Sequence, residues 1–305
     1  MKRKILILLA AAMLSLGANA QLLWKVTSPQ SGKTSYILGT HHFAPEGFLD
    51  SIPGFTQALN RVDKLYGELD MDVLQDPEAL MVMQKKMIAP ADSTLDKLLS
   101  AAQMDSLRRV WSQYGPAEIP EQVLTMLTPA AVSTQLAAGM ARKMLTPMDL
   151  SQGIDQMAQT RARLVGKEVG GLESLSMQAD ILYGAPISRQ AADLVEMVEN
   201  IESEGQDVVQ LTNAYLKQDM PALENMILKA IQKDPEGQAR LITDRNKRWA
   251  KKLMKEMHWT PTMVVVGAGH LPTPEGLLQL LRDAGYTVEP IDNTPAKKLS
   301  KKSAK

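Results

Sequence analysis

Short apolar runs bounded by turn residues mark both ends of the chain, which is the pattern of β-strands. Strands are predicted over 22–27, 34–38, 64–70, 167–172, 262–266 and 286–291. The first two are separated by Ser28-Pro29-Gln30-Ser31-Gly32-Lys33, whose turn composition predicts a hairpin. The run over 262–266 is apolar and β-branched throughout, as expected of a buried parallel strand.

Helical periodicity dominates the middle of the chain. Apolar positions follow helical spacing over 71–161 and again over 174–257, with prolines breaking the first stretch into segments. The order β-β-α-β, long helical middle, β-α-β predicts a mixed α/β fold. We expect one domain over 21–292, with a central mixed sheet built from its two ends and a helical insertion at about 72–260 as a cap.

Two shorter helices are predicted beside the strands. Asp50 or Ser51 can begin a helix that runs to about Val62. A second helix is expected from Thr273 to Ala284, because Gly285 fits the position just past a helix end.

The N-terminus has the pattern of a secretory signal peptide. Positive residues at 2–4 precede an apolar run at 5–16, and small residues at 17–20 provide a cleavage site before Gln21. No later stretch reaches the roughly 18 apolar residues of a membrane helix. The sequence therefore predicts a soluble periplasmic or secreted protein. The lysine-rich end, 293–305, is interpreted as a solvated tail rather than a polyanion-binding arm.

Composition excludes several classes of chemistry. The chain has no cysteine, so disulfides, thiolate metal sites and a Cys nucleophile are ruled out. Its 34 basic and 34 acidic residues balance, and nothing in this balance favours nucleic acid as a partner. The expected partner is a peptide or small-molecule substrate. The 19 methionines are interpreted as helical core packing, with an adaptable apolar groove as the alternative.

The pattern Gly-x-x-His occurs twice, each time directly after a predicted strand. Gly39-Thr40-His41-His42 and Gly267-Ala268-Gly269-His270 together hold three of the four histidines. Ligands gather past the carboxyl ends of strands in open α/β sheets, so the two loops predict one shared site. Gly39, Gly267 and Gly269 would allow close backbone approach. A structural turn is the alternative for the first loop. Phosphate binding is the alternative for the second, which lacks the Lys-Ser/Thr ending of a P-loop.

Charged residues elsewhere could complete such a site. On a strand, Glu68 and Asp70 would share a face and would repel each other without a cation or proton between them. The alternative is a solvated edge strand. Arg245 lies four residues before Trp249 on a predicted helix and could clamp a carboxylate or oxyanion. The alternative is a surface charge, and His258 is interpreted as a surface or packing residue.

Taken in order, these motifs resemble the TraB/GumN family, which is related to the Tiki proteases. The resemblance runs from 22 to about 291, and its more distant relatives include erythromycin esterases and a haem-binding protein. It implies a mixed sheet-and-helix fold and, from the Tiki branch, divalent-metal-dependent peptide cleavage. The residues that carry it are Gly39-Thr40-His41-His42, Glu68-Leu69-Asp70, Gly171-Leu172-Glu173-Ser174, Arg245 and Val266-Gly267-Ala268-Gly269-His270-Leu271.

By position, the resemblance makes His42 and His270 the motif histidines, Glu68 the acidic residue and Arg245 the arginine. His41 occupies a variable slot of the first motif. Asp155 and Glu173 also fall in patterned positions, to which no chemical role is assigned.

Three functions remain open. The first is a metal-dependent hydrolase, most simply a peptidase, in which His42, His270 and Glu68 hold Mn, Co or Zn with one position open for water. Arg245 would stabilise the oxyanion, and Asp70 would orient a ligand. The second is a metal-free, esterase-like hydrolase, with His42 or His270 as general base beside Glu68. The third is a non-catalytic protein that binds a small ligand or haem.

Overall fold

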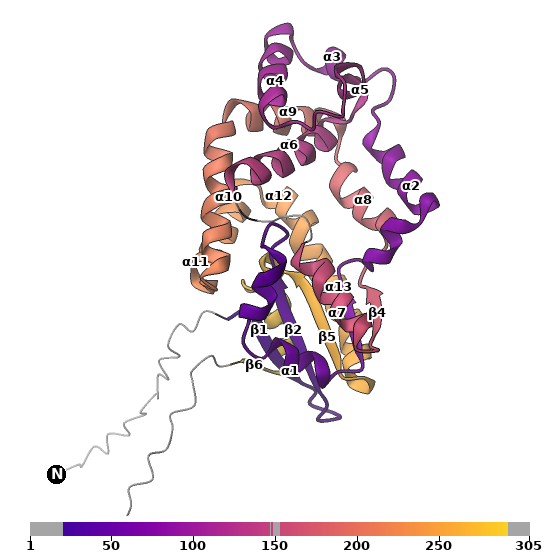
Figure 1. Cartoon of the computed structure of the whole chain (residues 1–305), viewed down its shortest axis with the longest axis vertical. Helices are drawn as coiled ribbons and strands as arrows, with labels where there is room; N and C mark the ends of the chain where they lie inside the picture. The colour runs from indigo at the N-terminus through magenta and orange to yellow at the C-terminus, as the bar shows by residue number, and fades with distance from the viewer. Residues whose placement is uncertain (1–20, 147, 149–152, 292–305) are drawn as a thin grey trace, which may run out of the picture.

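A six-stranded mixed sheet forms the base of the molecule (Figure 1). The computed structural model describes residues 21–146, 148 and 153–291, so the predicted signal peptide and lysine-rich tail lie outside the described residues. The strand order is β4-β3-β5-β2-β1-β6. The strands are β1 (Leu23–Thr27), β2 (Thr34–Thr40), β3 (Lys64–Gly67), β4 (Glu168–Gly171), β5 (Thr262–Gly267) and β6 (Thr287–Pro290).

The pairing confirms the predicted mixed sheet. β1 and β2 form the antiparallel hairpin, with Leu23 opposite Leu38. β4, β3, β5 and β2 are parallel neighbours, so their carboxyl ends lie along one edge. β5 is central, and its residues 262–266 are all buried, as its β-branched sequence predicts. β4 comes from the helical middle of the chain, which therefore contributes a strand to the sheet as well as helices.

One set of helices shares the main apolar core with the sheet. Trp249 of α13 and Tyr215 of α10 are the largest fully buried side chains in it. The set comprises η1 (Glu46–Ser51), α1 (Phe55–Asn60), α7 (Ile154–Leu164), α10 (Ile201–Leu216), α11 (Met220–Lys233), α13 (Asp244–Trp259) and α14 (Leu277–Asp283).

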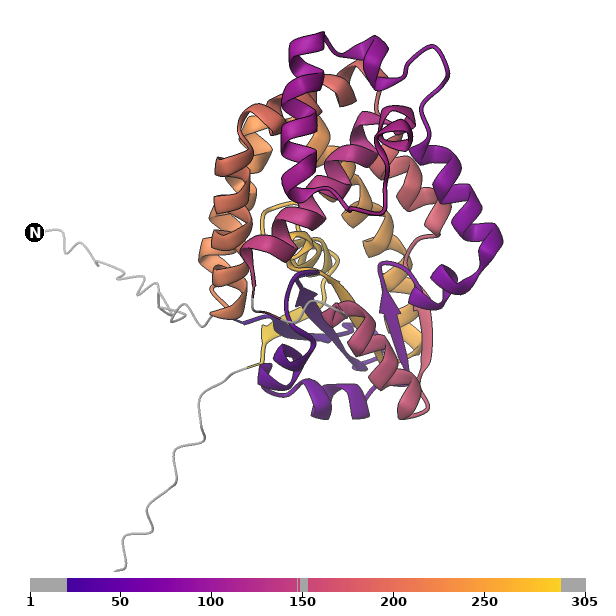
Figure 2. The same cartoon turned by 45° about the horizontal axis from the view of Figure 1, so that its top comes forward.

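A second set of helices forms a cap with its own apolar core. It comprises α2 (Pro77–Met87), α3 (Leu95–Leu98), α4 (Ala101–Tyr114), α5 (Glu121–Met126), α6 (Pro129–Met144), α8 (Leu175–Tyr183) and α9 (Ile187–Glu199). α2 follows β3, and α8 follows β4, so the chain enters the cap from the carboxyl ends of these strands. Figures 1 and 2 show the cap above that edge of the sheet. Within the described residues, no helix has the length and apolar character needed to cross a bilayer.

Three predicted boundaries are wrong, each because of local backbone geometry. The helix expected from 50 or 51 begins only at Phe55, since Gly54 has a φ of 79° and separates it from η1. The helix expected from Thr273 begins at Leu277, because Thr273 itself has a φ of 78°. The strand expected over 64–70 ends at Gly67, and Asp70 instead caps the short helix η2 (Met71–Gln75).

Candidate functional site

Each of the four parallel strands is followed by a residue of the candidate site. Glu173 follows β4, Glu68 follows β3 directly, His270 closes the short helix η4 (Ala268–His270) after β5, and His42 follows β2. β2 and β5 are hydrogen-bonded neighbours with Thr40 opposite Gly267, so the two Gly-x-x-His loops lie side by side. The sheet therefore brings together residues that are more than 200 positions apart in sequence.

Arg245 is the centre of a buried charge network. It follows a π-helical turn, η3 (Ala239–Thr243), and is 7 % exposed. Its NH2 group donates to both Glu68 and Glu173, and its Nε donates to Glu173 at 3.2 Å. Its NH1 group donates to the Leu241 carbonyl and to His270 Nε2, each at 3.2 Å. All five N–H donors of the guanidinium are thus engaged within the protein.

The indole ring of Trp249 packs against the Arg245 guanidinium. The guanidinium carbon of Arg245 lies 4.5 Å from the centroid of the Trp249 ring, and the His270 ring lies 4.4 Å from the same ring. The two α13 residues share a face, as their four-residue spacing predicts. The surface-charge alternative for Arg245 is therefore wrong.

Glu68 is kept ionised by its surroundings. Its Oε1 accepts the Gly267 amide at 2.8 Å and lies 3.8 Å from His270 Nε2. Burial opposes the charge, but the Arg245 guanidinium, the protonated His42 and the Gly267 amide hold the pKa of Glu68 below its usual range. The carboxylate is an anion at neutral pH, with Arg245 as its counter-ion.

His270 is neutral, and its tautomer is fixed. Both N–H groups of the Asn246 amide donate to backbone carbonyls, those of His270 and Glu275. Asn246 Oδ1 therefore accepts the proton on His270 Nδ1, at 2.8 Å, and leaves Nε2 as an acceptor. Burial lowers the pKa of His270 to about 4.

His42 differs, because its side chain is 67 % exposed. Its Nδ1 lies 2.8 Å from Asp155 Oδ2, while the Thr40 hydroxyl donates to the other oxygen of Asp155. The charge and hydrogen bond of Asp155 raise the pKa of His42 to about 9. Nε2 makes no hydrogen bond to any described residue.

His41 faces the helices rather than the site. Its Nε2 is 2.9 Å from the Thr212 hydroxyl of α10, and its ring packs against Tyr215 with centroids 5.5 Å apart. Burial lowers the pKa of His41 to about 4. The Tyr215 hydroxyl donates to the Gly39 carbonyl at 3.0 Å, so this group fixes the start of the first loop.

Two of the three predicted glycines are constrained by close neighbours. A Cβ on Gly39 would lie 2.7 Å from Leu271 and 3.1 Å from the Ala268 backbone, so the two loops could not pack. A Cβ on Gly267 would lie 3.3 Å from Glu68 Oε1, the atom that accepts the Gly267 amide hydrogen bond. Gly269 would meet only Ile227 and Ile242, at an ordinary 3.8 Å.

Asp70 is not brought to this cluster. Because β3 ends at Gly67, the predicted shared face of Glu68 and Asp70 does not exist. Asp70 instead caps η2 through the Asp72 amide and pairs with Arg163 of α7.

Three residues to which the sequence motifs assign no role complete the site. Asp155 holds His42, Glu173 holds Arg245, and Asn246 holds His270. The patterned positions of Asp155 and Glu173 were the available signal. Asn246 stands beside Arg245 in the sequence without any motif of its own.

Any metal ion at this site would have to bind side chains that already have hydrogen-bond partners in the protein. Among the described residues, no three His, Asp or Glu side chains come together in a group that could hold an ion. Glu68 and His270 form a pair, but Arg245 donates to both of them, and His42 is bound to Asp155. A metal ion held by these residues would therefore have to displace Arg245 from Glu68 and His270.

Comparison with known proteins gives one match. A model of the TraB/PrgY/gumN family matches residues 22–290, nearly the whole described chain. Searches of curated proteins and of solved structures found no significant match.

Proposed function

This chain belongs to the TraB/PrgY/gumN family, and from the site at its sheet edge we propose that it is a hydrolase, most simply a peptidase-like one. The observation that carries the proposal is the His42–Asp155 pair. It is an exposed imidazole, oriented by a carboxylate, next to a buried cluster that holds Glu68 as an anion. A His–carboxylate pair of this kind performs general acid–base chemistry in acyl transfer.

In the proposed reaction, Nε2 of neutral His42 accepts a proton from water, and the hydroxide formed attacks the substrate carbonyl. Asp155 stabilises the imidazolium that results, as it does in the resting protein. Nε2 then returns the proton to the leaving group, so that protons balance over the cycle. Since the pKa of His42 is about 9, the imidazolium predominates at neutral pH, and the neutral base becomes abundant only in alkaline solution.

Arg245 acts by positioning. Its five donors are occupied, so none remains for a substrate carboxylate or an oxyanion, the role that the sequence suggested. It neutralises Glu68 and Glu173 and fixes the carboxylate that borders the site. Water exclusion around this cluster strengthens every charge interaction in it.

Metal dependence stays a prediction, and one observation favours it as a second candidate. A histidine with Nδ1 bound to an amide oxygen and Nε2 free of a proton, as in His270, is in the tautomer that metal-binding histidines adopt. Mn, Co or Zn bound by His270, Glu68 and His42 would acidify a water molecule. Such an ion requires Arg245 to release Glu68 and His270.

One experiment separates these possibilities. Protein purified without chelator or affinity nickel is analysed for metal content, and hydrolysis of peptide and ester libraries is compared with that of His42→Ala and the His42→Ala/His270→Ala variant. Hydrolysis by metal-free protein that is lost in His42→Ala supports the proposal. Near-stoichiometric metal that disappears in the double variant, with activity that needs it, supports the second candidate. Absence of hydrolysis with or without each metal overturns both and leaves ligand binding, including haem uptake, as the function to test.

Export is proposed from residues 1–20 alone. The composition of this segment predicts cleavage before Gln21. N-terminal sequencing of protein from the periplasmic fraction of the source cell, or from its medium, should begin at Gln21. Recovery of the uncleaved chain in the cytoplasm would overturn the export proposal without affecting the hydrolase proposal.

A further inference from the structure

The residues that lead into β1 are buried. Gln21 is 2 % exposed, Leu22 is fully buried and Leu23 is 2 % exposed. The Leu22 carbonyl accepts the Gly39 amide at 2.8 Å, so the pairing of the hairpin continues beyond β1 toward Gln21. A chain segment tied into a sheet in this way is fixed rather than frayed.

The amide of Gln21 is buried without a partner. Neither Oε1 nor Nε2 makes a hydrogen bond, which leaves one acceptor and two N–H donors unsatisfied. Among the described residues, Gln21 is the only one with two buried side-chain atoms that lack a partner. Buried amides of this kind are rare because they destabilise a fold, so this one requires an explanation.

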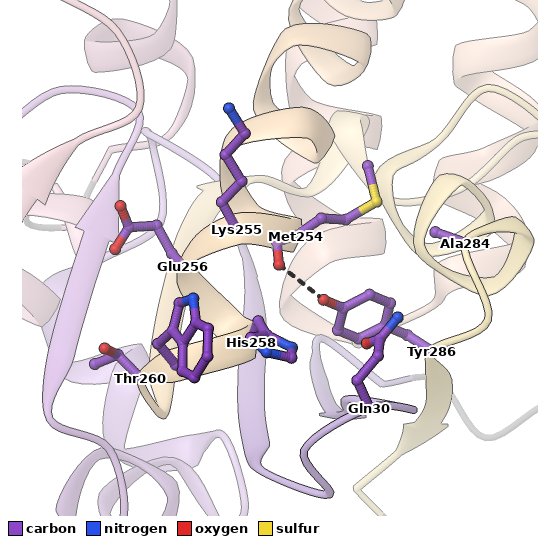
Figure 3. A pocket seen from close by; sticks show the side chains of 9 residues that line it. Gln30, Met254, Lys255, Glu256, His258, Thr260, Ala284 and Tyr286 are labelled. Carbon is purple, nitrogen blue, oxygen red and sulfur yellow. Dashed lines mark hydrogen bonds between the residues drawn. The ribbon is translucent and has the colours of Figure 1, made fainter.

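A second glutamine, at the opposite end of the same hairpin, has an ordinary environment. Gln30 is exposed on the β1–β2 turn, and its Oε1 accepts the Ser28 hydroxyl at 3.2 Å. Figure 3 shows Gln30 at an open hollow that Tyr286 also lines. Burial without partners is therefore specific to Gln21 and is not a property of the hairpin as a whole.

Position 21 is also where the composition of residues 1–20 predicts cleavage. Cleavage there converts the peptide nitrogen of Gln21 into an α-amine, in the same residue as the unpartnered amide. The two groups of an N-terminal glutamine can react with each other, because the bond between them closes a five-membered ring.

We propose that the mature protein begins with pyroglutamate formed from Gln21, an inference that rests on the export proposal. The α-amino nitrogen attacks the side-chain carbonyl carbon Cδ, a new C–N bond forms, and the Cδ–Nε2 bond breaks. Nε2 leaves as ammonia and takes with it the proton that the amine loses. No oxidant, reductant or second substrate takes part, so atoms and electrons balance.

The lactam lacks the groups that disfavour burial of this residue. It keeps Oε1 as a carbonyl oxygen and has a single N–H, whereas the open form has an amide with two donors and a charged α-ammonium. Loss of the terminal charge and of unpartnered donors favours burial. The hairpin register places this end of β1 beside Thr40 of the first Gly-x-x-His loop, so the modified terminus lies at the edge of the sheet that carries the candidate site.

Intact-mass spectrometry tests the proposal on protein recovered from the source cell. We expect a chain that begins at position 21 and is lighter than its sequence by one ammonia, and tandem spectra should place the loss on Gln21. Gln21→Glu should abolish the loss, because glutamate cyclises only by the much slower loss of water. Gln30→Glu is the matched control and should retain the loss, since Gln30 is exposed and distant from the terminus.

The effect of the lactam on the fold can be measured without any substitution. The mature chain is released in vitro from a fusion whose protease leaves Gln21 as the first residue, and its unfolding temperature is followed by calorimetry as ammonia is lost. We expect the cyclised form to unfold about 2–4 °C higher, because it no longer buries an unpartnered amide. Native cyclised protein should resist pyroglutamyl aminopeptidase, whereas its isolated N-terminal peptide should be cleaved, because the terminus is buried only in the fold.

The contrary results are distinguishable from one another. A chain that begins at position 21 and has the full mass of glutamine would overturn the proposal and leave export standing. A chain that retains residues 1–20 would overturn export and this proposal together, without affecting the hydrolase proposal. Equal unfolding temperatures for the open and cyclised forms would overturn the link between the burial of Gln21 and its cyclisation.

Discussion

The buried network around Arg245 and the exposed His42–Asp155 pair stand at the ends of neighbouring strands, yet they are built in opposite ways. In the network, every guanidinium donor has a protein partner, and Glu68 and Glu173 lie out of solvent. In the pair, one imidazole nitrogen is fixed by a carboxylate, and the other has no hydrogen bond to a described residue. A cluster in which every guanidinium donor is hydrogen-bonded can fix the geometry of the site, but it has no free donor for a substrate. A half-occupied imidazole can exchange a proton.

Removing Arg245 should have the largest effect, because it leaves two buried carboxylates without a counter-ion. Arg245→Met is expected to lower the free energy of unfolding by about 3–5 kcal/mol and to abolish hydrolysis. Urea denaturation measures the first effect. Arg108→Met is the matched control, since Arg108 makes two ion pairs at the surface and its loss should cost under about 1 kcal/mol. Equal unfolding midpoints for the two variants would show that the network contributes nothing to stability.

Removing His42 should separate activity from stability. His42→Ala is expected to lower kcat by about 10²–10⁴-fold, the usual contribution of a general acid–base group. Its free energy of unfolding should change by no more than about 1 kcal/mol, because the side chain is exposed. His258→Ala, at the far end of α13, is the control and should change neither quantity. Full activity in His42→Ala would transfer the acid–base role to another group.

Replacing Asp155 should move the pH dependence. The folded pKa of His42, about 9, exceeds its ordinary 6.5, so the ion pair stabilises the fold fully below about pH 6.5, and this contribution is lost as pH rises through 9. With His42 as base, kcat/KM should rise with pH and level off above about pH 9. In Asp155→Asn the rise should occur nearer pH 6.5. An unchanged profile would mean that His42 does not set the rate.

Asp70 should have the smallest effect, because it belongs to neither group. Asp70→Ala removes the cap of η2 and the Arg163 pair, at a cost of about 1 kcal/mol. Steady-state kinetics should give the wild-type kcat. A tenfold loss of kcat would restore the expectation from sequence that Asp70 orients a group in the site.

The strands could be predicted because their signals are local. The apolar run at 262–266 and the turn at 28–33 depend only on neighbouring residues. The Gly-x-x-His loops were recognisable for the same reason, since each follows its own strand. The end of β3 was misplaced because Glu68 and Asp70 prolong an alternating pattern, although the chain turns after Gly67.

The pairings within the site could not be predicted in this way. The sequence around Arg245 is typical of a surface charge, and its contacts with Trp249 and two carboxylates appear only in the folded structure. Asp155 acquires its role only because α7 brings it to the end of β2, and Asn246 acquires its role only because η4 turns His270 toward α13. These contacts depend on tertiary packing, and no local spacing of residues in the sequence indicates them.

The position of β5 has a consequence for how the protein is made. β2 and β3 are formed from the first 70 residues, but they are not neighbours, because β5 lies between them and begins only at Thr262. A nascent chain therefore lacks the middle of its sheet until synthesis is nearly complete, and pairing over so long a separation is slow. The four site residues have no common edge before that strand inserts. Any activity that depends on them therefore requires that β5 has been synthesised and has paired with β2 and β3.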